Sequence, residues 1–273
     1  GRLYLVPTPI GNLKDITLRA LEVLQQADVI ACEDTRTSGK LLKHYDISTP
    51  TVSYHEHNGA TMRPKLLARL ASGEKVALIS DAGTPLISDP GYKLVREAQE
   101  AGHAVEPLPG ACAAITALSA SGLPTDQFTF VGFLPSKETA RWALLQSLKS
   151  AAGTLVFYES PKRIVATLEA IASVLGNERE AVLARELTKH YEELLRLSLP
   201  EMLTQLKARE SIKGEIVLLL GEAAKEAFSD ERLDELLLAA LEQSSTKEAA
   251  KQVAEQTGAS KSELYQRALE LKA

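Results

Sequence analysis

The chain has 273 residues, of which 45% are hydrophobic and 25% charged, as expected for a folded globular protein long enough for two domains. Its net charge of −5 argues against an entirely basic nucleic-acid-binding surface, although it allows a local basic patch. No apolar run of about 18 residues and no signal-peptide layout at the start are present, so we expect no membrane span. Two cysteines, Cys32 and Cys112, suit a reducing cytoplasm better than a disulfide framework.

Short apolar runs alternate with helical patterns through the first 120 residues. The runs predict strands at 3–8, 28–34, 51–55, 75–80 and 104–110, and the periodic segments predict helices at 16–27, 36–45, 62–73 and 91–102. This alternation is typical of a mainly parallel sheet with helices on both faces. Because ligands of such sheets bind beyond the carboxyl ends of the strands, the candidate site comprises the loops at 8–12, 33–38, 80–91 and 107–112.

A turn-rich break, SGLPTDQF, separates a second block. It predicts strands at 128–134, 154–160, 180–188 and 214–221, with helices at 138–150, after Pro161 and at 201–208. Consecutive strands give this block more antiparallel character. We therefore expect an α/β fold of two α/β domains, at 1–121 and 122–222, followed by a helical extension at 223–273. Within the extension, two helical patterns joined by TGAS resemble a helix-turn-helix.

The loop SDAGTPLISDPG holds the clearest ligand signal. Pro85 and Pro90 stiffen it, and Gly83 and Gly91 allow close approach of the backbone to a ligand. We expect AGTPLIS to bind a ligand and DPG to start the following helix. The chain has neither the phosphate loop of nucleoside triphosphatases nor the GxGxxG of dinucleotide-binding proteins.

Other clusters allow more than one interpretation. His55 and His57 alternate on a predicted strand, but no third ligand accompanies them at a recognised spacing, so we expect no metal site. Cys112, among small apolar residues, is expected to be a buried small hydrophobe. Basic residues near predicted strand ends form either a solvated helix face or a phosphate-binding rim: Lys137, Arg141, Lys149, Lys162, Arg163, Arg185, Lys189 and His190.

A series of motifs carries a family resemblance over residues 3–221. In chain order they are LVPTPIGNLKDIT, ACEDTRTSGKLL, SDAGTPLISDPG, PLPGACAAITALSASG, GFLPSK, FYESPKR, LARELTKHYEE and KGEIVLLL. Together they resemble the tetrapyrrole-methylase superfamily of S-adenosylmethionine-dependent methyltransferases. Porphyrin methylases typically have GDP where this chain has Gly83-Thr84-Pro85, which favours the RNA-methylating branch.

The resemblance implies that S-adenosyl-L-methionine lies in the cleft between the two α/β domains. By motif, the implied cofactor contacts are Pro9, Ile10, Gly83, Thr84, Leu86, Ile87, Cys112, Ala113, Tyr158, Leu187 and Gly214. The implied reaction is 2′-O-methylation of a cytidine ribose in 16S rRNA of the small ribosomal subunit, by a cytoplasmic homodimer.

A ribose hydroxyl must lose its proton, so a base would help the reaction. The candidates are Asp81, His55, Glu159, Glu186 and Lys189, none of which has the spacing of a known catalytic set. Candidate contacts to the RNA are Arg36, Lys162, Arg163 and Arg185.

Two other functions remain open at this point. A corrin or porphyrin methyltransferase of the same fold is disfavoured by the missing GDP, and a DNA-binding regulator by the weak basicity of the last predicted helix. From Thr246 the chain has five basic and four acidic residues. The extension therefore serves equally well as a packing or dimer-stabilising module or as an RNA-docking module.

Overall fold

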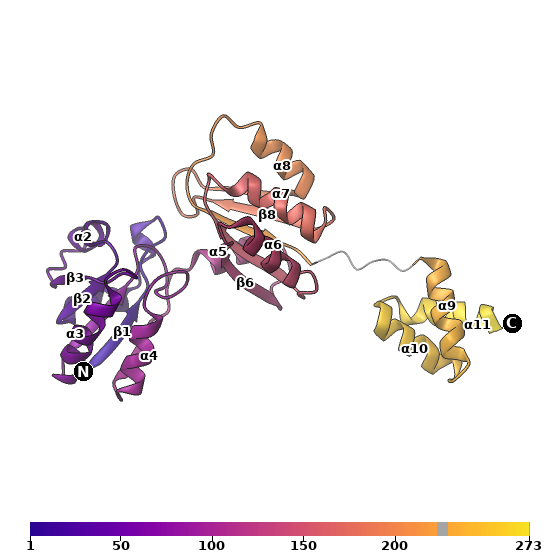
Figure 1. The fold of residues 1–273 in the computed structure, drawn as a ribbon, viewed down its shortest axis with the longest axis horizontal. Helices are drawn as coiled ribbons and strands as arrows, with labels where there is room; N and C mark the ends of the chain where they lie inside the picture. Colours follow the sequence, from indigo (N-terminus) through magenta and orange to yellow (C-terminus); the bar gives the residue numbers. More distant parts are fainter. Residues whose placement is uncertain (223–228, 273) are drawn as a thin grey trace. The chain divides into compact units, whose positions relative to one another are not determined.

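The computed structural model describes residues 1–222 and 229–272, which fall into two compact units, Gly1–Glu222 and Ala223–Ala273 (Figure 1). The first unit contains two β-sheets and the second contains only helices in its described part. Each unit is considered by itself below. No helix in the described ranges is both long and apolar enough to cross a membrane.

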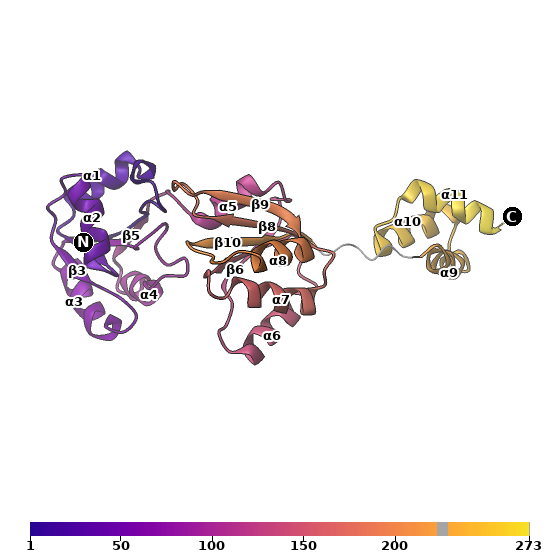
Figure 2. The ribbon, with the colours of Figure 1, turned by 90° about the horizontal axis from the view of Figure 1, so that it is seen from above.

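The first sheet is entirely parallel, as predicted, with strand order β3-β2-β4-β1-β5. Its strands are β1 (Arg2–Val6), β2 (Val29–Cys32), β3 (Thr51–Ser53), β4 (Lys75–Ile79) and β5 (Ala104–Pro107). The connecting helices are η1 (Leu13–Asp15), α1 (Leu18–Gln26), α2 (Thr35–His44), α3 (Gly59–Ala71) and α4 (Tyr92–Glu100). Apolar residues of α1 and α2 pack on one face of the sheet and those of α3 and α4 on the other (Figure 2).

The second sheet is mixed, with strand order β6-β7-β10-β8-β9; only the β6–β7 pair is parallel. Its strands are β6 (Phe128–Phe133), β7 (Thr154–Glu159), β8 (Glu180–Arg185), β9 (Glu193–Ser198) and β10 (Ile216–Leu220). Three helices cover one face: α6 (Glu138–Ser147), α7 (Ile164–Leu175) and α8 (Leu199–Lys207). The predicted antiparallel character of this block is confirmed.

One helix, α5 (Ala113–Ser121), covers the opposite face of the second sheet (Figure 2). Ala114, Ala117 and Leu118 of α5 pack against Val156, Val182 and Val217 of the sheet. The predicted first domain, 1–121, includes these residues because they precede the turn-rich break at 121–128. In the structure, the apolar side of α5 is buried in the core of the second sheet, so α5 packs with the second sheet and not with the first.

The local sequence pattern does not predict β9. This strand pairs only with β8, so it lies at the edge of the sheet, and its residues alternate between half-buried and exposed. Glu193 and Arg196 interrupt its apolar pattern, which weakens the strand signal in the sequence. A complete capping box at Ser198 and Glu201 then starts α8 directly after the strand.

The second unit holds α9 (Asp230–Leu241), α10 (Thr246–Thr257) and α11 (Lys261–Lys272) around a small core that includes Leu237, Val253 and Leu264. The predicted helix–turn–helix pair corresponds to α10 and α11. Gly258 ends α10 in the left-handed conformation, which a glycine adopts at little cost. The first part of the predicted extension, at 223–228, lies outside the described residues.

Candidate active site

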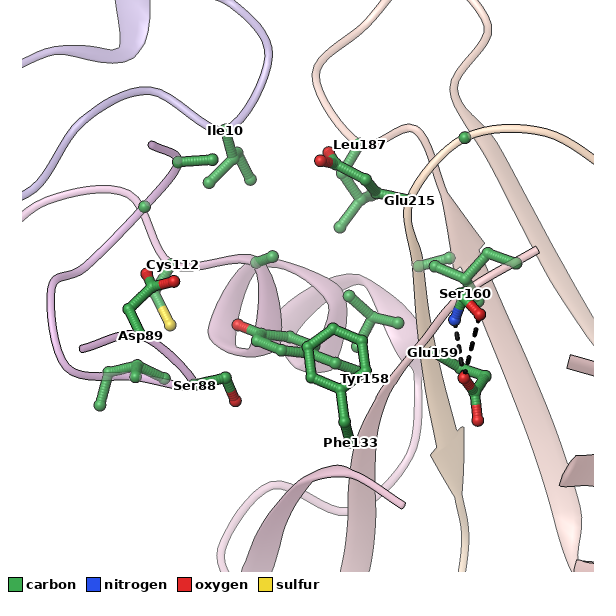
Figure 3. Close-up of a pocket in the computed structure, with 18 of the residues that line it drawn as sticks. Ile10, Ser88, Asp89, Cys112, Phe133, Tyr158, Glu159, Ser160, Leu187 and Glu215 are labelled. Carbon is green, nitrogen blue, oxygen red and sulfur yellow. Dashed lines mark hydrogen bonds between the residues drawn. The ribbon is translucent and has the colours of Figure 1, made fainter. Parts of the chain in front are cut away.

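A cavity of about 350 Å³ opens within the first unit and draws its lining from both sheets (Figure 3). The residues that surround it come from the loops after β1 and β4, the start of α5, the ends of β6, β7 and β8, and the start of β10. They are Ile10, Asp81, Ala82, Gly83, Thr84, Ile87, Ser88, Asp89, Cys112, Ala113, Phe133, Tyr158, Glu159, Ser160, Pro161, Ala184, Leu187, Gly214, Glu215, Ile216 and Val217. Its volume and mainly apolar lining are those of a small-molecule site.

The loop after β4 shapes one wall through its backbone. Gly83 forms two backbone hydrogen bonds with Thr8, of 2.9 and 3.0 Å, which tie this loop to the loop after β1. Leu86 and Ser88 both have positive φ, of 72° and 63°. Leu86 therefore turns its side chain toward the core on α4, while its neighbours Ile87 and Ser88 line the cavity. Such backbone strain in non-glycine residues is typical of ligand sites.

The segment DPG (Asp89–Gly91) is predicted only to start the next helix. In the structure α4 begins at Tyr92, after Gly91 at φ 140°, so Pro90 lies outside its first turn. Asp89 instead lines the cavity beside Cys112 (Figure 3). Cys112, expected to be a buried small hydrophobe, is only half-buried and also lines the cavity.

The charged residues that line the cavity are all acidic. Four of its lining residues are acidic, namely Asp81, Asp89, Glu159 and Glu215, and no described lysine, arginine or histidine lines it. Burial, with the neighbouring carboxylates of Glu33 and Asp81, raises the pKa of Asp89 to about 6. Such a cavity favours a cationic ligand and disfavours phosphate groups.

Two of these carboxylates have structural partners. Asp81 Oδ1 accepts a hydrogen bond of 3.1 Å from the backbone N–H of Asp34, the residue that caps α2. The Glu159 side chain is fully buried and accepts hydrogen bonds from Thr167 Oγ1 (2.6 Å) and the backbone N–H of Ser160 (2.8 Å). It points away from the cavity (Figure 3). Glu159 thus braces α7 and is poorly placed as a base.

An aromatic wall closes one side of the cavity. The Tyr158 ring meets Phe130 and Phe133 edge to face, with centroid distances of 5.0 and 5.7 Å. The Tyr158 hydroxyl accepts a hydrogen bond from the backbone N–H of Ala114 at the start of α5 (3.2 Å). Burial, and then the nearby Cys112, raises the pKa of Tyr158. Tyr158 therefore stays a neutral phenol.

A charged cluster lies beside the cavity. Lys189 Nζ bonds Glu186 Oε1 (2.8 Å) and Glu215 Oε2 (2.7 Å). The hydrogen bond from Lys189 lowers the pKa of Glu186; burial alone would lower the pKa of Lys189, but its two carboxylate partners raise it overall. Both groups therefore stay charged at neutral pH. A Cβ on Gly214 would overlap the Glu186 side chain, and one on Gly11 would overlap Lys189, so two glycines accommodate this cluster.

His55 lies elsewhere. The expected strand ends at Ser53, and Tyr54–Asn58 forms a turn in which Asn58 Oδ1 accepts from the His55 N–H (2.9 Å). The prediction that His55 and His57 alternate on a strand is therefore wrong, because the Asn58 side chain replaces a strand partner. His55 does not line the cavity. Within the described ranges, no three histidine, cysteine, aspartate or glutamate side chains gather as metal ligands would.

The four predicted RNA contacts differ in their surroundings. Arg36 is 88% exposed and pairs with Asp34 at 2.8 Å, and Lys162 is exposed. Arg163 is instead bonded to the carbonyl of Leu134 at 2.6 Å. Arg185 pairs with Glu193 at 2.8 Å. The first two are available to a ligand, whereas the last two hold the second sheet and its loops together.

The structure brings together nine of the eleven predicted cofactor contacts: Ile10, Gly83, Thr84, Ile87, Cys112, Ala113, Tyr158, Leu187 and Gly214. Pro9 is buried outside the lining, and Leu86 faces the core. Other lining residues were not predicted as ligand contacts, among them Asp89, Phe133 and Glu215. Each of these lies within a quoted motif, so the motifs located the region but did not show which side chains face inward.

The lining fits S-adenosylmethionine. Its apolar side chains and backbone suit an adenosine, and its carboxylates suit the positive sulfonium and ammonium groups. Gly83 and Gly214 lie where a side chain would crowd the lining. A Cβ on Gly83 would lie 3.2 Å from Ile10 Cγ2, and one on Gly214 would overlap Glu186.

Comparisons with known proteins identify the family of this chain. The family of Tetrapyrrole (Corrin/Porphyrin) Methylases matches residues 2–203, and the RsmI C-terminal HTH domain matches residues 226–272. A protein from Mesorhizobium japonicum named ribosomal RNA small subunit methyltransferase I is 51% identical over 270 residues, covering 99% of this chain and 92% of the relative. Its namesake from Escherichia coli O157:H7 is 51% identical over 273 residues, covering 99% and 95%.

A solved structure shares the fold of the first unit. It is uroporphyrin-III C-methyltransferase from Thermus thermophilus complexed with S-adenyl homocysteine, with a TM-score of 0.57 and 21% identity, covering 82% of this chain and 98% of that one. At this identity the likeness shows the fold alone. The full-length identity to the curated relatives goes further: the chain belongs to the tetrapyrrole methylase family and, within it, to the ribosomal RNA small subunit methyltransferase I proteins.

Proposed function

We propose that this protein transfers the methyl group of S-adenosylmethionine to the ribose 2′-oxygen of a cytidine in 16S rRNA. The observation that carries the proposal is the cavity itself, which has an apolar wall, the carboxylates of Asp81, Asp89 and Glu215, and no described cation in its lining. Such a site stabilises a sulfonium and repels nucleotide phosphates. The rRNA substrate is supported by the names of full-length relatives that are 51% identical.

When bound, the donor supplies a methyl group on a positively charged sulfur, which leaves as a neutral thioether. The chain itself mainly has to hold donor and acceptor in line, and positioning of this kind is worth up to about 7–11 kcal/mol. The braced loop after β4 and the Tyr158 wall provide rigid surfaces for that purpose. The predicted donor contacts among the lining residues would hold the adenosine and methionine parts.

The acceptor hydroxyl must lose its proton, and Asp89 is the residue we propose to take it. Asp89 faces the cavity, forms no ion pair with any described cation, and has a pKa near 6, so it is ionised and basic enough at neutral pH. The other candidates are less suited. Asp81 already accepts a hydrogen bond from the Asp34 N–H. Lys189 is a cation, and Glu186 forms an ion pair with Lys189. His55 lies outside the lining.

We further propose that the substrate is rRNA within the small ribosomal subunit and that the protein acts in the cytoplasm as a homodimer. The names of the relatives support the subunit context. The homodimer rests on the family resemblance, and analytical ultracentrifugation of the purified chain tests it: sedimentation as a monomer at micromolar concentration contradicts it.

One experiment tests the reaction. The protein is incubated with methyl-labelled S-adenosylmethionine and, separately, small ribosomal subunits, naked 16S rRNA and a porphyrinogen. Label in a cytidine ribose, located by nuclease digestion and mass spectrometry, supports the proposal. Label only in the porphyrinogen, or in none of the three, overturns it. Comparison of subunit with naked RNA identifies the physiological substrate.

A further inference from the structure

Strand β6 contains an irregularity that controls where its aromatic side chains point. Its parallel pairing with β7 shifts register between Phe130 and Gly132, and Gly132 has φ 72°. This is a β-bulge that inserts one extra residue into the strand. Bulges frequently re-aim a side chain next to an active site.

The bulge places two phenylalanines on one face. In a regular strand, residues 130 and 133 would face opposite sides of the sheet, because side chains alternate. Here Phe130 pairs with Val156 and Phe133 with Tyr158, two β7 residues that share a face. Both rings consequently lie against the ring of Tyr158, and Figure 3 shows the Phe133–Tyr158 contact.

The two phenylalanines differ in exposure. Phe130 is half-buried, whereas Phe133 lines the cavity and remains 52% exposed. At the bulge, Gly132 has positive φ, and a Cβ there would make a tight contact of 3.1 Å with Ser88 Oγ in the loop after β4. The local backbone thus holds a large apolar ring at the rim of the cavity, partly open to water, where burial would otherwise be favoured.

We propose that Phe133 is a stacking platform for the nucleobase of the acceptor nucleotide. The inference rests on the proposed function and names its base-binding subsite. A splayed RNA base is commonly held by stacking on an aromatic side chain. Tyr158 supports the Phe133 ring from one side, and the exposed side offers an apolar surface next to the carboxylates of the cavity.

The acceptor base suits this position better than the adenine of the donor. The lining at Ile10 is less accessible than at Phe133: Ile10 is only 7% exposed, and a Cβ on Gly83 would lie 3.2 Å from Ile10 Cγ2. Phe133 lies at the exposed rim, which a nucleotide of a large RNA can reach while its chain remains outside. We therefore assign the exposed rim at Phe133 to the acceptor base and the less accessible part of the lining to the donor.

The test compares Phe133→Ala and Phe133→Trp with a matched control, Phe128→Ala. Phe128 starts the same strand, points to the same face, and is 40% exposed, but lies outside the lining. Two dissociation constants are measured for each full-length variant without turnover: that of S-adenosylhomocysteine by calorimetry, and that of the RNA substrate by filter binding in the presence of S-adenosylhomocysteine. Methyl transfer by the wild type is measured alongside.

Phe133→Ala is expected to weaken RNA binding roughly 10- to 100-fold, the range for loss of one base–aromatic stack, with S-adenosylhomocysteine binding unchanged. Phe133→Trp retains RNA binding, and Phe128→Ala changes neither constant. If Phe133→Ala weakens S-adenosylhomocysteine binding instead, the ring contacts the donor and the inference fails. Unchanged constants in Phe133→Ala also overturn it. A wild type that methylates no RNA overturns the proposed function and, with it, this subsite.

Discussion

Asp81 Oδ1 accepts a hydrogen bond of 3.1 Å from the backbone N–H of Asp34. These residues follow β4 and β2, neighbouring strands of the parallel sheet, and lie 47 positions apart in the sequence. The bond joins the loop that lines the cavity to the N-cap of α2, where Asp34 accepts from the Arg36 N–H (2.8 Å). A carboxylate that looks catalytic in the sequence thus holds two loops together.

This arrangement predicts different effects for two substitutions of Asp81. Asp81→Asn keeps an oxygen that can accept the Asp34 N–H. We therefore expect its free energy of unfolding to equal that of the wild type and its rate of methyl transfer to fall less than tenfold. Asp81→Ala leaves the Asp34 N–H without its partner and should cost about 1 kcal/mol of stability and weaken donor binding. Urea denaturation and single-turnover methyl transfer measure both effects. A loss of activity in Asp81→Asn as large as in Asp89→Asn would instead identify Asp81 as a base.

The raised pKa of Asp89 predicts a pH dependence of activity. The pKa is about 6 in the folded protein, so methyl transfer should fall as the pH decreases through 6 and the carboxylate is protonated. Asp89→Asn removes the proton acceptor and should slow single-turnover transfer about 10²- to 10⁴-fold. Glu215→Gln, which changes a more exposed lining carboxylate, is the matched control and should retain the wild-type pH profile. A profile for Asp89→Asn that still falls near pH 6 contradicts the assignment.

The same shift predicts an effect on stability. Because the folded pKa lies above the ordinary value of 3.8, Asp89 contributes its stabilisation below about pH 4 and loses it as the pH rises through 6. Asp89→Asn should therefore be more stable than the wild type at pH 7.5, by about 1–2 kcal/mol after allowance for solvent screening, and equal to it at pH 4. Urea unfolding at both pH values measures the difference. A less stable variant at pH 7.5 would show that the carboxylate has a stabilising partner.

Gly214→Ala should disturb the cavity from its edge. Gly214 has φ 94°, and an added Cβ would displace the Glu186 side chain and its bonds to Lys189 and the Glu215 N–H. We expect the dissociation constant for S-adenosylhomocysteine to rise roughly tenfold or more, since small misplacements at a binding site are costly. Gly176→Ala is the control: it has φ 88° but nothing within 4 Å, so it suffers only backbone strain of about 1–2 kcal/mol. Equal binding by the two variants, measured by calorimetry, would contradict this role for Gly214.

In the helical unit, Arg267 connects α11 to α9. Its guanidinium bonds Asp234 at 2.5 Å and Asp230 at 2.7 Å. Arg267→Met should make this unit more sensitive to limited proteolysis while S-adenosylhomocysteine binding by the first unit stays unchanged. Lys251→Met, which removes an exposed pair with Glu248, is the control and should leave the proteolysis pattern as in the wild type. Loss of donor binding in Arg267→Met would show that the two units are energetically coupled.

Sequence patterns predicted the parallel sheet and most of its helices, and the signal is clearest at the central strands β2 and β4, which are buried along almost their whole length. They did not predict β9, because charged residues interrupt the apolar pattern of this edge strand. They also placed α5 with the wrong sheet, because α5 packs on valines that are distant from it in the sequence. They also failed at His55, where one asparagine side chain closes a turn. In each case the deciding interaction is with a residue that the local pattern does not contain.

The sequence by itself determined the family, the alternation of strands and helices around the parallel sheet, and the loops that hold most of the donor site, because these depend on local periodicity and contiguous motifs. Only the tertiary structure decided which side chains of those loops face the cavity. Asp89 and Phe133 face it because positive φ at Ser88 and a bulge at Gly132 turn the backbone there. Glu159, Arg163 and Arg185 instead have hydrogen-bonding partners elsewhere in the second sheet and its loops. Side-chain direction depends on backbone conformation and on partners brought close by folding, which no single stretch of sequence contains.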